Sequence, residues 1–220
     1  MSESTWVPTP IADTYQSIQK AAAGYVLMPT DDEVLDVAGV GIRRAIDKMN
    51  SRTWNWALVY NDITFVAGTQ EYQLQTQFKQ PRNFALRNTS GADVNRISFK
   101  PWGIFLKECQ WGFVGQPNFY SVTNANLYGV LRLDLSPNSS FTSIYPTGRL
   151  WYYRRVSYPG GDSTSLDVPS EAVRFIQAQA EGYVADRYAV AKAASAYARA
   201  EQAYRDIVRD DCHGQQADWE

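Results

Sequence analysis

The stretch from residue 168 to about residue 209 constrains the fold most, because it has the periodicity of a long helical segment. Asp167, Pro169 and Glu171 form a helix-start signature, since a proline at the first helical position loses only an unpaired N–H and acidic side chains suit the positive end of the helix dipole. The apolar residues of the second half lie on a face rotated from that of the first half. In a straight helix packed on one neighbour, the apolar face would not rotate so far, so we expect a kink or short break near 188–192. The simplest interpretation is a core helical hairpin.

Small side chains are frequent in the second half of this stretch and permit close contact between helices. A second interpretation is therefore that the alanine- and tyrosine-rich half also packs against another copy of the same chain. The candidate subunit-packing face comprises Ala194, Tyr197, Tyr204 and Val208.

Two helical patterns precede the middle of the chain. Residues 11–23 are compatible with a short helix, and residues 34–50 carry an apolar helical stripe preceded by Thr30 and Glu33, which have the spacing of a capping box. The pattern then changes to strand-like runs, at 63–66, 71–74, 84–87, 96–99, 119–122, 128–135 and 148–157. The first two runs flank a glycine turn at 67–70 and predict a β-hairpin. Residues 101–109 predict a short helix between strands.

The order of helices, strands and helices predicts an α+β fold, in which the N- and C-terminal segments form a helical bundle with an inserted antiparallel β module. The predicted parts are an N-terminal arm and helices at 1–60, the β module at 61–157, and the C-terminal helices and extended tail at 158–220. We expect these parts to form one structural domain overall.

Charge is distributed unevenly, although the formal net charge is only −2. Residues 61–157 carry ten Lys/Arg against five Asp/Glu, whereas residues 158–220 carry six against eleven. Opposed potentials favour encounter more than they add affinity, so a basic middle and an acidic end could steer neighbouring copies into register. We expect the two to lie at opposite ends or sides of the subunit.

Catalytic motifs are missing from the sequence. His213 is the only histidine and lies in a polar segment, Cys109 and Cys212 lack the spacing of a metal site, and there is no phosphate-binding glycine loop, HExxH or CxxC. We therefore expect no enzymatic activity, no cofactor and no metal. The Trp54/Trp56 and Trp102/Trp111 neighbourhoods could stack on sugars, but burial is the commoner fate of such side chains.

Membrane insertion is not expected either. The N-terminus is polar and lacks the apolar core of a secretion signal, and no apolar run approaches the about 18–20 residues of a membrane helix. We expect the protein to be made in the cytoplasm in reduced form.

Several segments, read together, resemble the head-to-tail adaptor (connector) proteins of tailed bacteriophages. They are TDDEVL at 30–35, AIDKMN at 45–50, WNW at 54–56, ITFVAGTQEYQL at 63–74, GQPNFY at 115–120, LRL at 131–133, LWYYRR at 150–155 and DVP at 167–169. Each motif is unspecific alone, but their order and spacing cover most of residues 28–209. The N-terminal arm at 1–10 and the C-terminal tail match no pattern of the family.

The resemblance implies a structural virion protein without catalytic activity. Its expected partners are the portal protein, neighbouring copies of itself in a ring (commonly a dodecamer), tail or nozzle proteins, and double-stranded DNA that passes through the channel. Its expected place is the neck of the virion, between capsid and tail. The alternatives are another neck or tail-completion ring protein, or a carbohydrate-binding β module that uses exposed aromatic side chains.

The tail after Arg209 is a candidate partner-docking segment. It combines acidic residues with one large apolar side chain, that of Trp219, whose burial against a partner would be favourable. A buried Trp can contribute about 2 kcal/mol or more to binding. The alternative is that this side chain packs back on its own subunit. The candidate docking residues are Asp210, Asp211, Asp218, Trp219 and Glu220.

The predicted DNA channel leads to a first test. A channel must let DNA slide, and rows of Lys/Arg would retain phosphates by releasing their counterions, so we expect a lumen lined by acidic or neutral side chains. The isolated protein should bind duplex DNA no more tightly than about 1 µM at physiological salt, the nonspecific range, when measured by fluorescence anisotropy. A nanomolar Kd would contradict this expectation.

Overall fold

The computed structural model describes residues 15–28, 30–74, 77–123, 129–158, 166 and 168–214. It confirms an α+β fold and divides the chain into two compact units. The helical unit comprises residues 1–56 and 156–220, and the β unit comprises residues 57–155. The predicted division into parts at 61 and 157 stays a prediction. That the parts form one structural domain stays a prediction.

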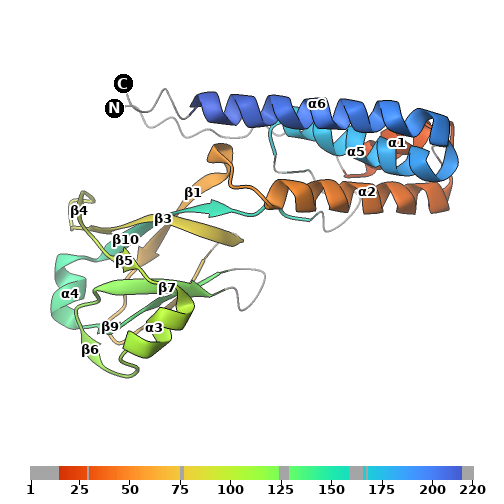
Figure 1. The fold of residues 1–220 in the computed structure, drawn as a ribbon. Helices are drawn as coiled ribbons and strands as arrows, with labels where there is room; N and C mark the ends of the chain where they lie inside the picture. The colour runs from red at the N-terminus through yellow and green to blue at the C-terminus, as the bar shows by residue number, and fades with distance from the viewer. Residues whose placement is uncertain are drawn as a thin grey trace. The chain divides into compact units, whose positions relative to one another are not determined.

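The helical unit is built around the helix that follows the β unit. This helix, α5 (Ser170–Tyr188), packs against α1 (Tyr15–Gly24), α2 (Asp32–Asn50) and α6 (Val190–Gly214) (Figure 1). Because α5 has neighbours on several sides, its buried residues include Val173, Phe175, Ile176, Ala180 and Val184.

The expected break in the C-terminal stretch is confirmed at Ala189, whose backbone (φ −153°, ψ 59°) is not helical. Helices α5 and α6 run antiparallel, as shown by contacts that pair early residues of one with late residues of the other. The rings of Phe175 and Tyr204 lie 5.2 Å apart, and Arg199 Nη2 lies 2.8 Å from Glu181 Oε2. The stretch therefore forms a helical hairpin.

Two details at the helix starts differ from the sequence-based expectation. The capping box of Thr30 and Glu33 is wrong, because the cap of α2 is Asp31, whose Oδ1 accepts hydrogen bonds from the backbone N–H groups of Glu33 (3.0 Å) and Val34 (3.3 Å). A carboxylate at this position accepts from two otherwise unpaired donors and suits the helix dipole. Pro169 is the residue before α5 rather than its first residue.

The β unit contains two four-stranded sheets and a two-stranded pair. The strand orders are β1-β10-β3-β4, β2-β8-β7-β5 and β6-β9. Most pairs are antiparallel as predicted, but β5–β7 and β6–β9 are parallel. The strands are β1 (Leu58–Thr64), β2 (Glu71–Gln73), β3 (Phe78–Arg87), β4 (Asp93–Arg96), β5 (Ser98–Phe99), β6 (Val114–Gly115), β7 (Phe119–Thr123), β8 (Val130–Leu133), β9 (Ser136–Pro137) and β10 (Thr147–Arg154), with helices α3 (Trp102–Glu108) and α4 (Ser139–Ile144). A short 3-10 helix, η1 (Asn55–Ala57), begins in the helical unit and ends at the first residue of the β unit.

The predicted hairpin between residues 63–66 and 71–74 is wrong. Its turn exists, with Gly68 at φ 81° and a hydrogen bond from Thr69 N to Val66 O (3.0 Å), but the flanking strands belong to different sheets. Ile63 pairs with Gly148, and Tyr72 pairs with Leu131. The turn therefore carries the chain from one sheet to the other.

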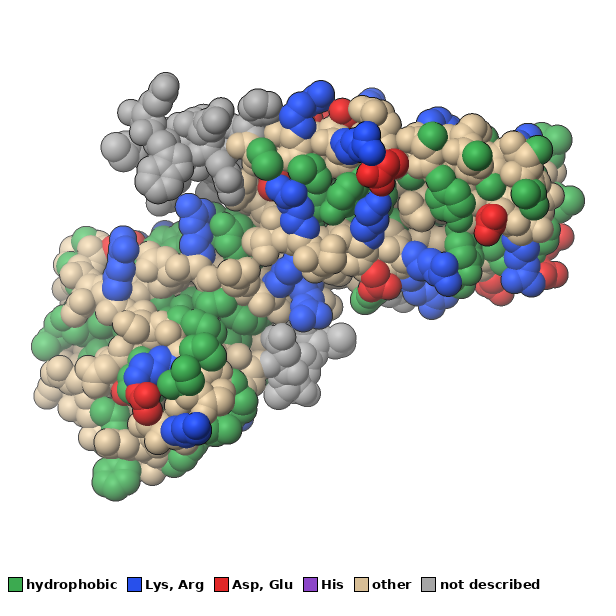
Figure 2. All heavy atoms as spheres, viewed as in Figure 1, with side chains coloured by type: hydrophobic (Ala, Val, Ile, Leu, Met, Phe, Trp, Pro, Cys, Tyr) green, Lys and Arg blue, Asp and Glu red, His purple; other side chains and the backbone are tan. Residues whose placement is uncertain are grey.

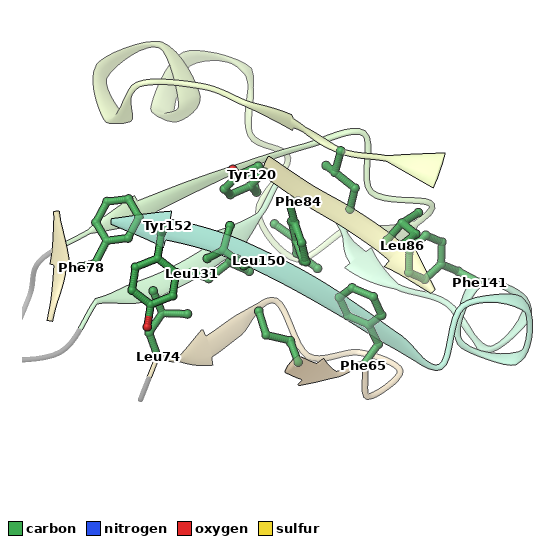
Figure 3. Packing of buried hydrophobic residues seen from close by; sticks show 13 residues of the cluster. Phe65, Leu74, Phe78, Phe84, Leu86, Tyr120, Leu131, Phe141, Leu150 and Tyr152 are labelled. Carbon is green, nitrogen blue, oxygen red and sulfur yellow. The ribbon is translucent and has the colours of Figure 1, made fainter. Parts of the chain in front are cut away.

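An aromatic-rich core fills the β unit (Figure 3). The ring centroids of Phe84 and Tyr120 lie 5.0 Å apart, those of Phe65 and Phe141 lie 5.4 Å apart. Aromatic rings prefer such edge-to-face arrangements, because the positive edge of one ring meets the negative face of the other. Gly148 permits this packing, since a Cβ there would lie 2.6 Å from the Phe84 ring.

The close contact of α2 with α5 leads to a stability prediction. A Cβ on Gly41 would lie 2.8 Å from the Cα of Ala180, so Gly41→Ala should cost about 1–3 kcal/mol by overpacking. This cost exceeds the gain of up to about 1 kcal/mol from helix propensity. Gly24→Ala is the matched control, because no atom lies within 4 Å of its new Cβ. Thermal unfolding should show a lower Tm for Gly41→Ala alone; equal Tm values for the two variants would contradict the prediction.

Candidate interaction surfaces

The end of α6 is attached to the residues that follow α2. Asp211 Oδ1 accepts a hydrogen bond from the backbone N–H of Asn55 (2.7 Å), and the Asn55 side-chain amide donates to the backbone oxygen of Asp211 (2.9 Å). Burial raises the pKa of the Asp211 carboxyl, while hydrogen bonds from Asn55 and Trp56 and the charge of Arg52 act in the opposite direction. Asp211 is therefore a contact of the chain with itself.

A groove of about 280 Å³ lies beside this contact, and we call it the terminal groove. Its walls are largely apolar, and three carboxylates stand along it. The buried indole N–H of Trp56 has no hydrogen-bond partner within the described part of the chain, and the Trp56 ring stacks on Trp54 with centroids 6.2 Å apart. The lining residues are Asn55, Trp56, Pro169, Glu171, Ile207, Asp210 and Asp211.

The structure places part of the predicted docking tail at this groove. Asp210 is exposed and Asp211 is half-buried in the last turns of α6. Asp218, Trp219 and Glu220 lie outside the described residues. The sequence did not single out Asn55 as a partner of Asp211, since no local pattern relates two residues so far apart in the chain.

The predicted subunit-packing face is divided by the fold. Tyr204 contacts Trp54 and Phe175, with ring centroids 5.9 Å and 5.2 Å away, and Tyr197 packs over Gly182, where a Cβ would lie 2.7 Å from the ring. These two side chains therefore serve the hairpin of their own chain. Ala194 is exposed and Val208 is half-buried. That this face also packs against another copy stays a prediction.

A second groove, of about 360 Å³, runs along the α5–α6 hairpin. Glu181 is buried beneath it and is paired with Arg199 and with the amide of Gln177, whose Nε2 lies 2.9 Å from Glu181 Oε1. Ala178 and Ala203 add apolar lining. The buried carboxylate at this groove is thus paired within the hairpin.

The tryptophans that the sequence suggested for sugar stacking differ in exposure. Trp54 is 2% exposed and donates its indole N–H to the Met49 carbonyl (2.7 Å), whereas Trp111 is 45% exposed. The guanidinium of Arg132 lies 5.1 Å from the ring of Trp102 and 5.6 Å from that of Trp111, at cation–π distance. Trp54 is therefore unavailable for sugar stacking, and the Trp102/Trp111 pair contacts a cation of its own unit.

Among the residues that the structure describes, no cluster of three or more His, Cys, Asp or Glu side chains could hold a metal ion. No helix in the described ranges has the length and hydropathy required to cross a bilayer.

The structure has a helical bundle interrupted by a β unit. This is the architecture that the sequence resemblance predicts for a head-to-tail adaptor of a tailed bacteriophage. Comparison with known families supports this class. The family model described as SU10 adaptor protein matches residues 13–219, and the chain belongs to this family. The protein is therefore a phage adaptor, a structural component of the virion neck. No curated protein matches the chain.

The contact between Asp211 and Asn55 can be tested by two substitutions. Asp211→Ala removes the acceptor and should lower the free energy of unfolding by about 1 kcal/mol. Asp211→Asn keeps an oxygen acceptor without the buried charge and should cost less. Because burial raises the folded-state pKa of Asp211, its carboxyl stabilises the fold fully below about pH 4 and loses that contribution as the pH rises through the raised value.

The measurement is chemical denaturation from about pH 3.5, just below the ordinary aspartate pKa of about 3.9, to about pH 7, well above it. Relative to Asp211→Asn, the wild type should become less stable as the pH rises. The opposite slope would show that the hydrogen bonds outweigh burial at this carboxyl.

Proposed function

We propose that the protein forms a ring of copies beneath the portal, commonly a dodecamer in such proteins, which extends the DNA channel and provides the attachment site for the tail. The match of the adaptor family over residues 13–219 carries this proposal. Its partners are then the portal protein, neighbouring copies and tail or nozzle proteins. During ejection, double-stranded DNA passes through without sequence-specific binding.

The surfaces of the helical unit support a role in assembly. The exposed acidic residues at the terminal groove, Glu171 and Asp210, suit a basic protein partner and would repel DNA phosphates. The groove is small, and its apolar walls include Trp56 and Ile207. Such a combination of apolar floor and charged rim is typical of a protein–protein contact.

The tail after α6 is the proposed fastener of the ring. Asp211 fixes the end of α6 to Asn55 of its own chain, which defines the point from which the remaining residues extend. Asp218, Trp219 and Glu220 then supply one apolar anchor with flanking carboxylates for the portal or a neighbouring copy. The portal and the neighbouring copy are distinguished by which of them crosslinks to this segment.

Electron microscopy of the virion neck tests the function as a whole. Tracing this chain in a ring between portal and tail is the expected result. Tracing it in another ring of the neck or tail would favour the tail-completion alternative, and absence of the chain from the virion would contradict the proposal.

Two truncations test the fastener. Ending the chain after Gly214 removes the proposed anchor and keeps the Asp211–Asn55 contact, whereas ending it after Arg209 removes both. Both variants should stay folded, with a somewhat lower Tm for the shorter one, and both should decorate portal rings at least about tenfold less, as expected for the loss of a hot-spot Trp. Trp219→Ala should reproduce the loss. Full decoration by the chain that ends after Gly214 would show that the tail is not the fastener.

A further inference from the structure

The terminal groove combines apolar walls with a buried hydrogen-bond donor. Trp56, Pro169 and Ile207 supply the apolar walls. The indole Nε1 of Trp56 is buried and has no hydrogen-bond partner among the described residues, so an occupant with a carbonyl oxygen at this point would satisfy it. The groove measures about 280 Å³, and a cavity of about 150 Å³ already admits benzene, so one large aromatic side chain fits.

The charges around this groove nearly balance. A guanidinium nitrogen of Arg209 lies 3.3 Å from Asp206 Oδ1, and another lies 3.5 Å from Asp210 Oδ1. Basic and acidic side chains are also interspersed over the face of the helical unit in Figure 2. An uncharged occupant therefore meets no repulsion, whereas the tail with Asp218 and Glu220 would add negative charge to a slightly acidic rim. The charged residues in the groove or beside it are acidic Glu171, Asp206, Asp210 and Asp211 and basic Arg52, Arg174 and Arg209, with Asp167 as a further acid close by in the sequence.

The N-terminal segment of the chain is uncharged and carries a large aromatic side chain. Residues 4–12, STWVPTPIA, contain no Lys, Arg, Asp or Glu, and Trp6 is their largest side chain. Pro8 and Pro10 fix their own φ and restrict the residues before them to extended backbone, so the segment loses little conformational entropy on binding. An extended proline-rich backbone has no internal hydrogen bonds, so its carbonyl oxygens can accept from a binding site.

The direction of α1 points this segment towards the groove. Helix α1 runs antiparallel to α2, because Gln19 Nε2 donates to the Leu35 carbonyl (2.9 Å), whereas the Tyr15 side chain lies against Gly39, one turn further along α2. The chain that precedes Tyr15 therefore joins α1 from the side on which α2 ends.

The length of the segment is sufficient to reach the groove. Trp56 lies near the end of α2, because its ring stacks on Trp54, which is bonded to the last turn of α2. From Gly39 the path is about 16 Å along α2 and about 10 Å across to a neighbouring helix, or about 26 Å. Nine residues separate Trp6 from Tyr15, and in an extended proline-rich conformation they span about 28 Å.

We propose that the N-terminal segment of the same chain binds in the terminal groove, with the Trp6 ring against Trp56 and Ile207 and a carbonyl oxygen of the segment accepting from the Trp56 indole N–H. Attachment to α1 gives the segment an effective concentration of about 1 mM, which the segment of a second copy does not reach in dilute solution. Glu171 and Asp210 stay exposed at the rim. The inference does not depend on the proposed ring, so its failure leaves the portal and neck experiments unaffected.

Disulfide trapping in the full chain tests where the segment lies. The tested pair is Val7→Cys with Asp210→Cys, in a chain that also carries Cys109→Ser and Cys212→Ser. In the matched control, Asp186→Cys replaces Asp210→Cys, because Asp186 is exposed and lies about 22 Å along α5 from the groove. Under mild oxidation, the tested pair should form an intrachain disulfide at least about tenfold faster than the control.

The variant Trp6→Ala shows whether the Trp ring is the anchor. In the tested pair it should slow disulfide formation at least about tenfold. Equal rates at residues 210 and 186, or a rate unchanged by Trp6→Ala, would overturn the proposal. Disulfide-linked dimers in place of the intrachain product, at about 1 µM protein, would assign the groove to a second copy and overturn its assignment to the same chain.

The hydrogen bond to Trp56 is tested by Trp56→Phe, which keeps an aromatic ring and removes the N–H. In the wild type this change removes a hydrogen bond, whereas in Trp6→Ala the donor has already lost its acceptor. Thermal unfolding should therefore show a larger decrease of Tm for Trp56→Phe in the wild type than in Trp6→Ala, by at least about 2 °C. Equal decreases in the two chains would overturn the assigned hydrogen bond.

Discussion

The fold depends on the point at which the chain leaves the helical unit and returns to it. The side chain of Asn50, the last residue of α2, accepts from the backbone N–H of Val156 (2.8 Å) and donates to its carbonyl oxygen (3.0 Å). One amide thus joins two segments separated by the whole β unit. Trp54 fills the space below by burying its ring against Tyr204. With the two ends held together, an inserted unit costs the bundle little, because loop-closure entropy grows only slowly with length.

The packing of the helical unit depends on how closely α2 and α6 approach α5. Gly41 of α2 lies against the backbone of Ala180, and Gly182 of α5 lies against the ring of Tyr197. The two glycines therefore face different neighbours, one on each side of α5. Once these contacts form, Tyr197 and Tyr204 are used inside the hairpin. Surfaces open to other proteins include those at the ends of the helices, where the turns and the terminal groove lie.

A phage adaptor works by contacts with other chains, and the strained Leu27 is informative for that reason. Side chains that stabilise a fold are buried in it, whereas Leu27 is exposed and its backbone is unfavourable. The turn at Leu27 thus presents an apolar side chain to solvent, as expected of a subunit that functions in an assembly.

The sequence by itself determined the coarse order of helices, strand block and helices, the break after α5, the short helix α3 and the family, because these follow from periodicity, turn residues and motif order. It did not predict helix α4 within the strand block. Only the tertiary structure decided that residues 63–66 and 71–74 join different sheets, that Asp211 contacts Asn55, and that Leu27 is left-handed and exposed. The physical reason is the distance along the chain between the residues that interact. Helix periodicity and breaks are set by neighbours within a turn or two, whereas strand partners and side-chain burial are set by segments distant in the chain, whose competition no local pattern records.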